Sequence, residues 1–341
     1  MGGAWLTGGL DALATETGWD PASAERIVGT SAGSMMGALL AGGVPPWFMV
    51  AHSAGETFQG VDDANGRPQA EADRAAGATY GIAPEARLPI GPGSWRLALS
   101  SLSNPTRHTP ATLVGGWLPR GVVSTEPLRR TVRRVVPEGW VEHPGTWIVA
   151  CDYADGRRVV FGRDDAPRAD LADAVAASCA IPGFYAPVEI GGREYVDGGM
   201  RSTSNLDLLG DQELDLVVCL NPTSSLHPPQ AWNPVERVAG AFRRVSGRRL
   251  GSEARELRAT GTRVVLIQPV SEDHRVMGPN LMSTRNRNPV IRTAIETVTR
   301  QLRQPEVREA LAGLPPGEPY KVARPPGPPS SWPRVGRAAR A

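Results

Sequence analysis

The sequence has few cysteines, little net charge and no long apolar run. Cys151, Cys179 and Cys219 lie far apart without CxxC spacing, which argues against a disulfide framework or a zinc site. We expect them to be free buried thiols in a reducing cytosol. The formal net charge of +2 gives no overall attraction to nucleic acid. No apolar stretch reaches the roughly 18 residues that a membrane-spanning helix needs, so none is predicted.

The sequence also lacks a basic segment followed by an apolar core at its N-terminus, so no secretory signal is predicted. No cluster of metal-ligating residues is visible, and we expect neither a metal nor another cofactor. What the chain does contain is glycine, at 39 of its 341 positions, and a hydrophobic share of 40%. That share is sufficient for a substantial core.

Short apolar runs alternate with helical patterns over most of the chain. Five runs have the composition of buried strands: Ile27–Val28, Trp147–Cys151, Val159–Phe161, Leu216–Leu220 and Val264–Ile267. The main helical patterns cover Thr125–Val136, Asp170–Cys179, Pro234–Thr260 and Asn288–Leu311. This alternation predicts an α/β fold, a three-layer α/β/α sandwich around a mainly parallel central sheet.

We expect a single domain over residues 1–312, with an insertion at about 53–122, and a tail at 313–341. The insertion is rich in Gly, Pro and Ala, and its middle, 60–78, is predicted to be poorly ordered. Its flanks carry apolar residues such as Trp95, Leu99 and Trp117, which fit a lid or a lipid-facing surface, or a variable segment packed on the core, about equally well. The tail has three Pro-Pro pairs and several arginines, which predicts disorder.

The stretch Gly29-Thr30-Ser31-Ala32-Gly33 joins the apolar run Ile27–Val28 to an apolar helical pattern. A serine on a tight strand-to-helix turn has the layout of a nucleophile elbow. The turn would place the Ser31 hydroxyl at a helix N-terminus, which favours developing negative charge. We expect glycine at 29 and 33 because a side chain at either position would clash. This motif alone does not exclude an ordinary glycine-rich turn.

A nucleophilic Ser31 needs a group that takes its proton, either a histidine backed by a carboxylate or a carboxylate alone. None of the five histidines has a convincing signature; they are His52, His108, His143, His227 and His274. One carboxylate stands out. Asp197 follows a predicted hairpin at 188–196 and precedes Gly198 and Gly199, which leave the backbone bare and approachable. By itself Asp-Gly is also a common turn.

Together, Gly29–Ser34 and Asp197-Gly198-Gly199 resemble the patatin-like phospholipases. The segment 176–188, ASCAIPGFYAPV after Ala176, is similar to that family's A-S-x-A-x-P-x-x-F-x-P segment, and Ala4–Leu10 is similar to its first helix. The similarity extends from residue 1 to about 300, with 53–122 poorly matched. The resemblance implies a patatin-like fold, lipid ester substrates and a catalytic dyad of Ser31 and Asp197.

The implied reaction is acyl transfer in two steps, with Asp197 as the base for Ser31 and then for water. Stabilisation of the oxyanion would supply much of the rate. The Ala32 N–H is one candidate donor, as the residue after the nucleophile. The resemblance assigns the other donors to a loop G-G-G-x-[KR]-G after a first strand, of which Gly3-Ala4-Trp5 matches the end, with Gly2 at the basic position.

The earlier glycines of that loop and the strand before it have no counterpart in the sequence. Either the natural start lies upstream of Met1, or the protein lacks these parts. We favour the first, because loss of a central strand would expose backbone edges.

Three functions follow. The leading hypothesis is a lipid acyl hydrolase of the phospholipase A or acylglycerol esterase type. The second is a catalytically impaired lipid-binding or scaffold protein with an incomplete oxyanion loop. The third is a Ser-His-Asp carboxylesterase. We expect a cytoplasmic protein with transient membrane contact; the sequence sets no oligomeric state. The arginines of the pattern at 234–260 are interpreted as a solvated face rather than a membrane contact.

Overall fold

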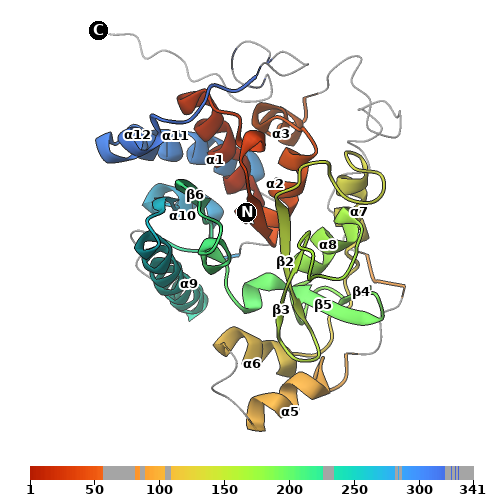
Figure 1. The fold of residues 1–341 in the computed structure, drawn as a ribbon. Coiled ribbons are helices and arrows are strands. Elements are labelled where there is room, and N and C mark those ends of the chain that lie inside the picture. The colour runs from red at the N-terminus through yellow and green to blue at the C-terminus, as the bar shows by residue number, and fades with distance from the viewer. Residues whose placement is uncertain are drawn as a thin grey trace.

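The computed structural model describes residues 1–56, 81–84, 89–103, 109–225, 234–280, 283, 286–318, 324, 327 and 329. These residues form a layered α/β fold (Figure 1). The strands are β1 (Ile27–Thr30), β2 (Thr146–Asp152), β3 (Arg158–Phe161), β4 (Val188–Ile190), β5 (Arg193–Asp197), β6 (Leu216–Leu220) and β7 (Arg263–Ile267). The helices are α1 (Gly2–Thr17), α2 (Ala32–Ala41), α3 (Pro46–Ser53), α5 (Trp95–Ser103), α6 (Pro110–Trp117), α7 (Glu126–Arg133), α8 (Leu171–Ser178), α9 (Pro234–Ala259), α10 (Ser271–Met277), α11 (Arg287–Leu302) and α12 (Pro305–Leu311).

Strand β2 is the centre of the larger sheet. It pairs in parallel with β1 and antiparallel with β3 and β5, and β4 extends the sheet beyond β5. Strands β6 and β7 form a separate parallel pair. The α/β class is confirmed, but the sheet is mixed rather than mainly parallel. The reason is connection length, since β2–β3 and β4–β5 are joined by short turns, whereas parallel neighbours need a long crossover.

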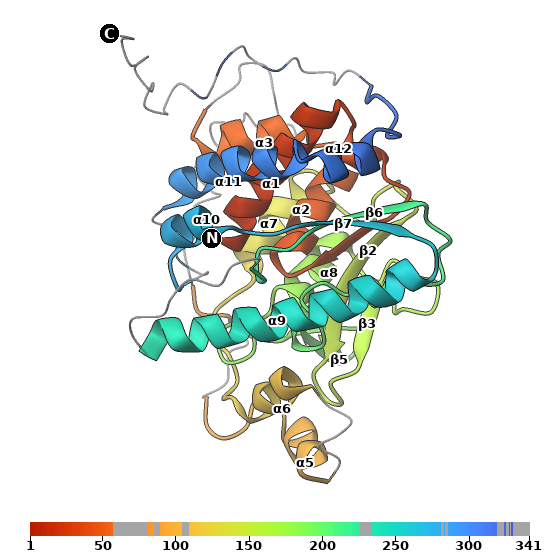
Figure 2. The ribbon, with the colours of Figure 1, turned by 90° about the vertical axis from the view of Figure 1, so that its left-hand side faces the viewer.

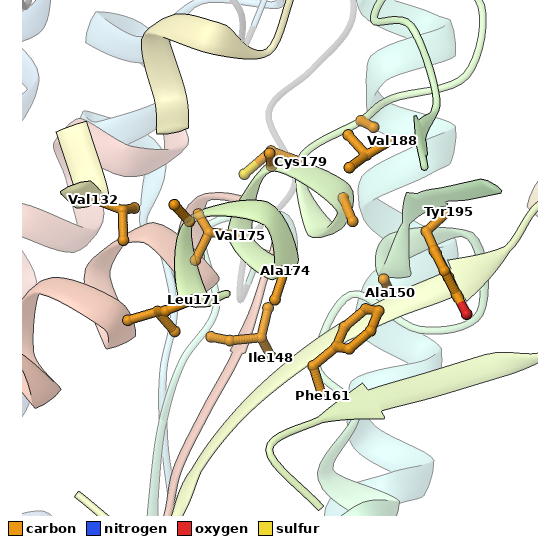
Figure 3. Close-up of a cluster of buried hydrophobic side chains, with 14 of the residues drawn as sticks. Val132, Ile148, Ala150, Phe161, Leu171, Ala174, Val175, Cys179, Val188 and Tyr195 are labelled. Atoms are coloured by element: carbon orange, nitrogen blue, oxygen red, sulfur yellow. The ribbon is translucent and has the colours of Figure 1, made fainter. Parts of the chain in front are cut away.

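The main core lies between β2 and the helices α7 and α8. Every residue of β2 is buried, as expected for a strand covered on both faces. Figure 3 shows Ile148 and Ala150 facing Leu171 and Ala174 of α8. Phe161 completes this cluster by packing edge-on against Tyr195, with ring centroids 5.1 Å apart. The predicted hairpin around 191–192 is confirmed, and both of its glycines have positive φ.

A second core joins α1 to the C-terminal helices. Trp5 is fully buried in it together with Ala294 and Val298 of α11. Figure 2 shows α11 and α12 lying along α1 at the end of the molecule opposite to α5 and α6. The close approach of α1 and α11 depends on Gly8, because a Cβ at this position would lie 2.5 Å from the Ile291 carbonyl oxygen.

One predicted helix is wrong in its extent. The pattern at Asn288–Leu311 is two helices, with α11 ending at Leu302 and α12 beginning at Pro305. Pro305 occupies the first turn of α12, where its missing N–H costs nothing, but it cannot continue α11. The break lets α12 turn back to bury Leu311 in the second core.

Parts of the predicted insertion and tail are described. The insertion contains α5 and α6, while its middle, 60–78, lies outside the described residues. In the predicted tail, the Gly317 N–H donates to the Gly18 carbonyl at 2.7 Å, and Arg324 contacts the Asp11 carboxylate at 3.1 Å. Most of 319–341 lies outside the described residues, so the domain boundaries stay a prediction. Among the described helices, none is long and apolar enough to cross a bilayer.

We predict that Gly8→Ala destabilises the protein by roughly 1–3 kcal/mol, because the added methyl group overlaps the α11 backbone. Gly240→Ala in α9 is the matched control. A Cβ at Gly240 meets no atom within 4 Å, so helix propensity alone should stabilise this variant by about 0.5–1 kcal/mol. Urea unfolding midpoints measure both. An equal rise in the unfolding midpoint of the two variants would contradict the close packing of α1 on α11.

Candidate active site

The serine of the predicted elbow lies at a strained turn. Ser31 leaves β1, caps the N-terminus of α2, and has φ 53° and ψ −124°. A positive φ is uncommon for a residue with a side chain and marks a position held by its surroundings. Gly29 permits the turn, because a Cβ there would lie 2.5 Å from Ser34 Cα. The sharp strand-to-helix turn predicted from the sequence is present.

The expectation for Gly33 is wrong. A Cβ at this position would lie within 4 Å of no atom outside its own helical turns. Gly33 is the second residue of α2 and its side-chain position faces open space, so no clash requires glycine.

A buried serine fixes the elbow to the sheet. The Ser31 N–H donates to Ser178 Oγ at 2.9 Å, and the Ser178 hydroxyl donates to the Val149 carbonyl of β2 at 2.6 Å. Ser178 is fully buried at the end of α8. From the other side, the Ser34 hydroxyl donates to the Ser31 carbonyl at 2.6 Å. The strained residue is therefore held through both of its backbone polar groups.

Asp197 lies at the end of β5, which pairs with β2. Its N–H donates to the Ala180 carbonyl at 3.0 Å, and its Oδ1 accepts the Gly199 N–H at 2.7 Å. Gly198 lets this turn approach β2, since a Cβ there would lie 2.4 Å from the Val149 carbonyl oxygen. Both glycines after the aspartate therefore have a structural role, one in close packing and one as a donor.

The strand register brings Ser31 and Asp197 together. Strand β3 pairs with Val149 and Ala150 along one edge of β2, so β1 and β5 share the other edge, where Thr30 lies opposite Val149 and Asp197 lies opposite Ala150. The C-terminal ends of β1 and β5 therefore meet on this edge, and Ser31 leaves β1 beside Asp197 with no strand between them. The Ser31 hydroxyl lies close enough to the Asp197 carboxyl to lower its pKa, against the effect of burial.

Burial raises the pKa of Asp197 to about 6. Removal from water disfavours the charged carboxylate, and the hydrogen bonds from Ser31 and Gly199 oppose this effect in part. Asp197 is only 6% exposed. Its carboxylate is thus a stronger base than an ordinary aspartate, while remaining ionised at neutral pH.

The residues predicted to stabilise an oxyanion lie at two adjacent helix N-termini. The first hydrogen bonds within α2 and α1 are donated by the Ser34 N–H and the Trp5 N–H. The N–H groups of Ala32 and Gly3 lie before these donors and take no part in the bonding within the helices. A Cβ on Gly3 would lie 3.8 Å from Ala32 Cβ, and one on Gly2 would lie 3.5 Å from Pro222. The positive ends of both helix dipoles therefore meet beside Ser31.

Sequence reasoning missed Asn205. Its Nδ2 donates to Thr30 Oγ1 at 3.0 Å, directly before the nucleophile, and its Oδ1 accepts from Arg158 at 3.0 Å. Its φ of 51° is left-handed, a conformation that asparagine tolerates better than most residues. Asn205 joins the segment after Asp197 to the strand that carries Ser31.

Glu253 of α9 holds the segment after Asp197 through hydrogen bonds to Ser204 and Leu206. Its carboxylate is 1% exposed and accepts from the Ser204 hydroxyl at 2.7 Å and the Leu206 N–H at 3.1 Å. Arg249, one turn earlier on α9, is 2.6 Å from its second oxygen. No sequence signal pointed to this role, since charged residues are frequent along this helical pattern.

The described histidines are engaged elsewhere. His143 lies 2.7 Å from the Ala24 carbonyl oxygen, and His274 lies 2.8 Å from Ser225 Oγ. Burial lowers the pKa of His274 to about 4. His52 stacks on Phe48 at the end of α3, with ring centroids 6.2 Å apart. His108 and His227 lie outside the described residues.

A cavity of about 400 Å³ lies elsewhere, and neither Ser31 nor Asp197 is among its lining residues. Its walls are ion-paired, with Arg193 2.9 Å from Asp152 and Arg158 2.8 Å from Asp207. Within the described part of the chain, no three His, Cys, Asp or Glu side chains are grouped so as to hold a metal ion.

The family model described as patatin-like phospholipase matches residues 1–209. This range contains the elbow, Ser178, Asp197 and Asn205. The chain belongs to the patatin-like phospholipase family, which confirms the resemblance inferred from its motifs. Members of this family are lipid acyl hydrolases, and in these general terms the chain is a hydrolase of lipid esters.

We predict that Ser178→Ala lowers the free energy of unfolding by about 1–3 kcal/mol and reduces esterase activity more than tenfold. The variant leaves the buried Ser31 N–H without its acceptor, so the strained turn relaxes. Ser252→Ala, which removes an exposed hydrogen bond to Glu256, should change stability by less than about 0.5 kcal/mol. Equal effects of the two variants in thermal unfolding and ester hydrolysis would argue against this role.

Asp197→Asn should stabilise the fold at neutral pH. The carboxyl pKa rises from 3.8 in the unfolded chain to about 6 in the folded one, so the ionised form is disfavoured on folding. The gain should reach up to about 3 kcal/mol above pH 6 and disappear below about pH 4, where both states are protonated. Urea unfolding across this pH range measures it. Asp211→Asn, at a carboxylate whose pKa is lowered, should show no such gain.

Proposed function

We propose that the protein hydrolyses carboxylic ester bonds of phospholipids or acylglycerols through a dyad of Ser31 and Asp197. The observation that carries this proposal is the strand register, which brings Ser31 at its strained elbow to Asp197, beside two helix N-termini. The substrate class comes from the family.

In the first step, Asp197 accepts the Ser31 proton while Oγ attacks the ester carbonyl. A tetrahedral oxyanion forms and then expels the alcohol, which takes the proton from Asp197. An acyl-serine remains. The amides of Ala32, Gly3 and Gly2 are the proposed donors to the oxyanion, and such donors contribute about 3–4 kcal/mol each.

In the second step, water attacks the acyl-serine and Asp197 accepts a proton from that water. The same donors stabilise the second oxyanion, and its collapse releases the fatty acid and returns the proton to Ser31. The raised pKa of Asp197 suits both steps, since it brings the base closer to working pH while leaving it ionised.

A Ser-His-Asp esterase fits less well. The described histidines nearest to strand ends, His143 and His274, bond to Ala24 and Ser225 rather than to Ser31. The impaired lipid-binding protein is one of the outcomes of the experiment below.

Ser31→Ala should abolish both hydrolysis of a short-chain nitrophenyl ester and labelling by a fluorophosphonate probe. Asp197→Asn should lower kcat at least a thousandfold, whereas substitution of each histidine by glutamine should leave activity within about threefold of the wild type. Labelling that survives in Ser31→Ala would exclude this nucleophile, and a histidine variant that loses activity would favour a triad. Absence of labelling in the wild type would favour the lipid-binding protein.

The pH dependence should follow Asp197. Because the base must be ionised, kcat/KM should fall to half its plateau near pH 6 and about tenfold for each further pH unit below it. A plateau that continues to pH 4 would show that the base has an ordinary aspartate pKa.

A further inference from the structure

The hairpin of α5 and α6 is apolar on both of its sides. On α5, Leu97 and Ala98 are fully buried against the core, yet Trp95, Leu99 and Leu102 point outward and are 60%, 58% and 68% exposed. The spacing of these three residues places them in one stripe on the outer side. Helix α5 therefore carries an apolar stripe on the side that faces away from the core, in addition to the apolar residues that it buries.

Helix α6 repeats the arrangement. Val114 and Trp117 are exposed, whereas Gly115 and Gly116 face inward. A Cβ on Gly116 would lie 2.9 Å from Leu97 Cγ, so the two helices pack tightly through small residues. The outer stripes of α5 and α6 therefore belong to one rigid unit, and contiguous exposed apolar surface of this kind marks an interaction site.

Hydrogen bonds join α6 to the segment that follows Asp197, the candidate base. The Thr112 hydroxyl donates to the Met200 carbonyl at 3.1 Å, and Thr109 donates to the same oxygen. A Cβ on Gly115 would lie 2.8 Å from Met200 Cε. Met200 follows Asp197 by three residues, so the exposed stripes lie on an element in direct contact with the active-site turn.

Basic residues lie beside the stripes. On α5 Arg96 is exposed, whereas Arg120, which follows α6, is paired with Glu194. Helix α6 lies beside α9 in both views (Figures 1 and 2). On α9, Arg244 and Arg248 are exposed next to Phe242 and Val245, which are 46% and 58% exposed. Exposed apolar residues thus lie among the arginines on this part of α9.

We propose that the outer sides of α5 and α6, with the Phe242–Arg248 part of α9, form a docking surface for an anionic phospholipid bilayer. Tryptophan and leucine stripes flanked by arginines are the pattern of helices that lie in the membrane interface. Charge complementarity favours this occupant over a second copy of the chain, because a two-fold contact would bring the exposed Arg96, Arg244 and Arg248 of both copies to one interface. The lipid partner rests on the proposed function, which needs access to lipid esters.

Binding is measured with the Ser31→Ala chain, so that hydrolysis does not alter the membrane. Vesicles of phosphatidylcholine with phosphatidylserine should co-sediment this chain, and vesicles of phosphatidylcholine alone should retain about tenfold less. Replacing Leu99, Leu102 and Val114 together by serine should weaken binding about tenfold or more. Unchanged binding of this variant, or no binding of the parent chain, would overturn the proposal.

A control pair of arginines lies on α11 and α12, at the end of the molecule opposite to α5 and α6 (Figure 2). Arg244→Gln with Arg248→Gln should remove most of the preference for phosphatidylserine, whereas Arg300→Gln with Arg308→Gln on α11 and α12 should retain it. Equal behaviour of the two pairs would overturn the assignment of α9 to the surface. Brominated phosphatidylcholine should quench the fluorescence of Trp95 and Trp117, and Trp95→Phe with Trp117→Phe should remove that quenching.

The soluble nitrophenyl ester separates this proposal from the proposed function. The triple serine variant made on the active chain should hydrolyse the soluble ester at the wild-type rate while losing hydrolysis of vesicle phospholipid. If the wild-type chain does not hydrolyse the soluble ester, that result contradicts the proposed function and leaves the docking surface unaffected. A wild-type chain that dimerises through the stripes, with dimers lost in the serine variant, would overturn the bilayer as occupant.

Discussion

The hydrogen bonds of the Ser178 hydroxyl are the constraint on which the site depends. Ser178 accepts from the Ser31 N–H and donates to the Val149 carbonyl, so one buried side chain joins α8, the elbow and the central strand. The same carbonyl limits the turn after Asp197 to glycine. The Val149 carbonyl of β2 therefore positions both the elbow of Ser31 and the turn after Asp197.

Around this centre the structure is built in two halves with different properties. On one side, α1 and α11 pack through Gly8 with backbones in near contact, and their rigidity places the N-terminus of α1 beside that of α2. On the other side, Glu253 and Asn205 hold the segment after Asp197 through buried hydrogen bonds. Apolar packing therefore positions the proposed oxyanion donors, whereas a polar network positions the base.

The elbow, the hairpin before Asp197 and most strands could be predicted from the sequence because their signals are local. Glycines at 29 and 191–192 mark turns within a few residues of the strands that they end. Ser178 and Asn205 could not be predicted in their roles, since each pairs with the elbow across 147 and 175 residues of chain. Likewise, an apolar helix such as α5 does not reveal in its sequence which side faces the core, and only the burial of Leu97 decides it.

The burial of Asp197 has a consequence for how this sequence changes over time. A carboxylate at this position weakens the fold at neutral pH, so selection for stability alone would replace it with asparagine, a single-nucleotide change that keeps the shape and the acceptor for the Gly199 amide. Under the proposed mechanism, the charge that lowers the stability of the fold is the charge that accepts the Ser31 proton.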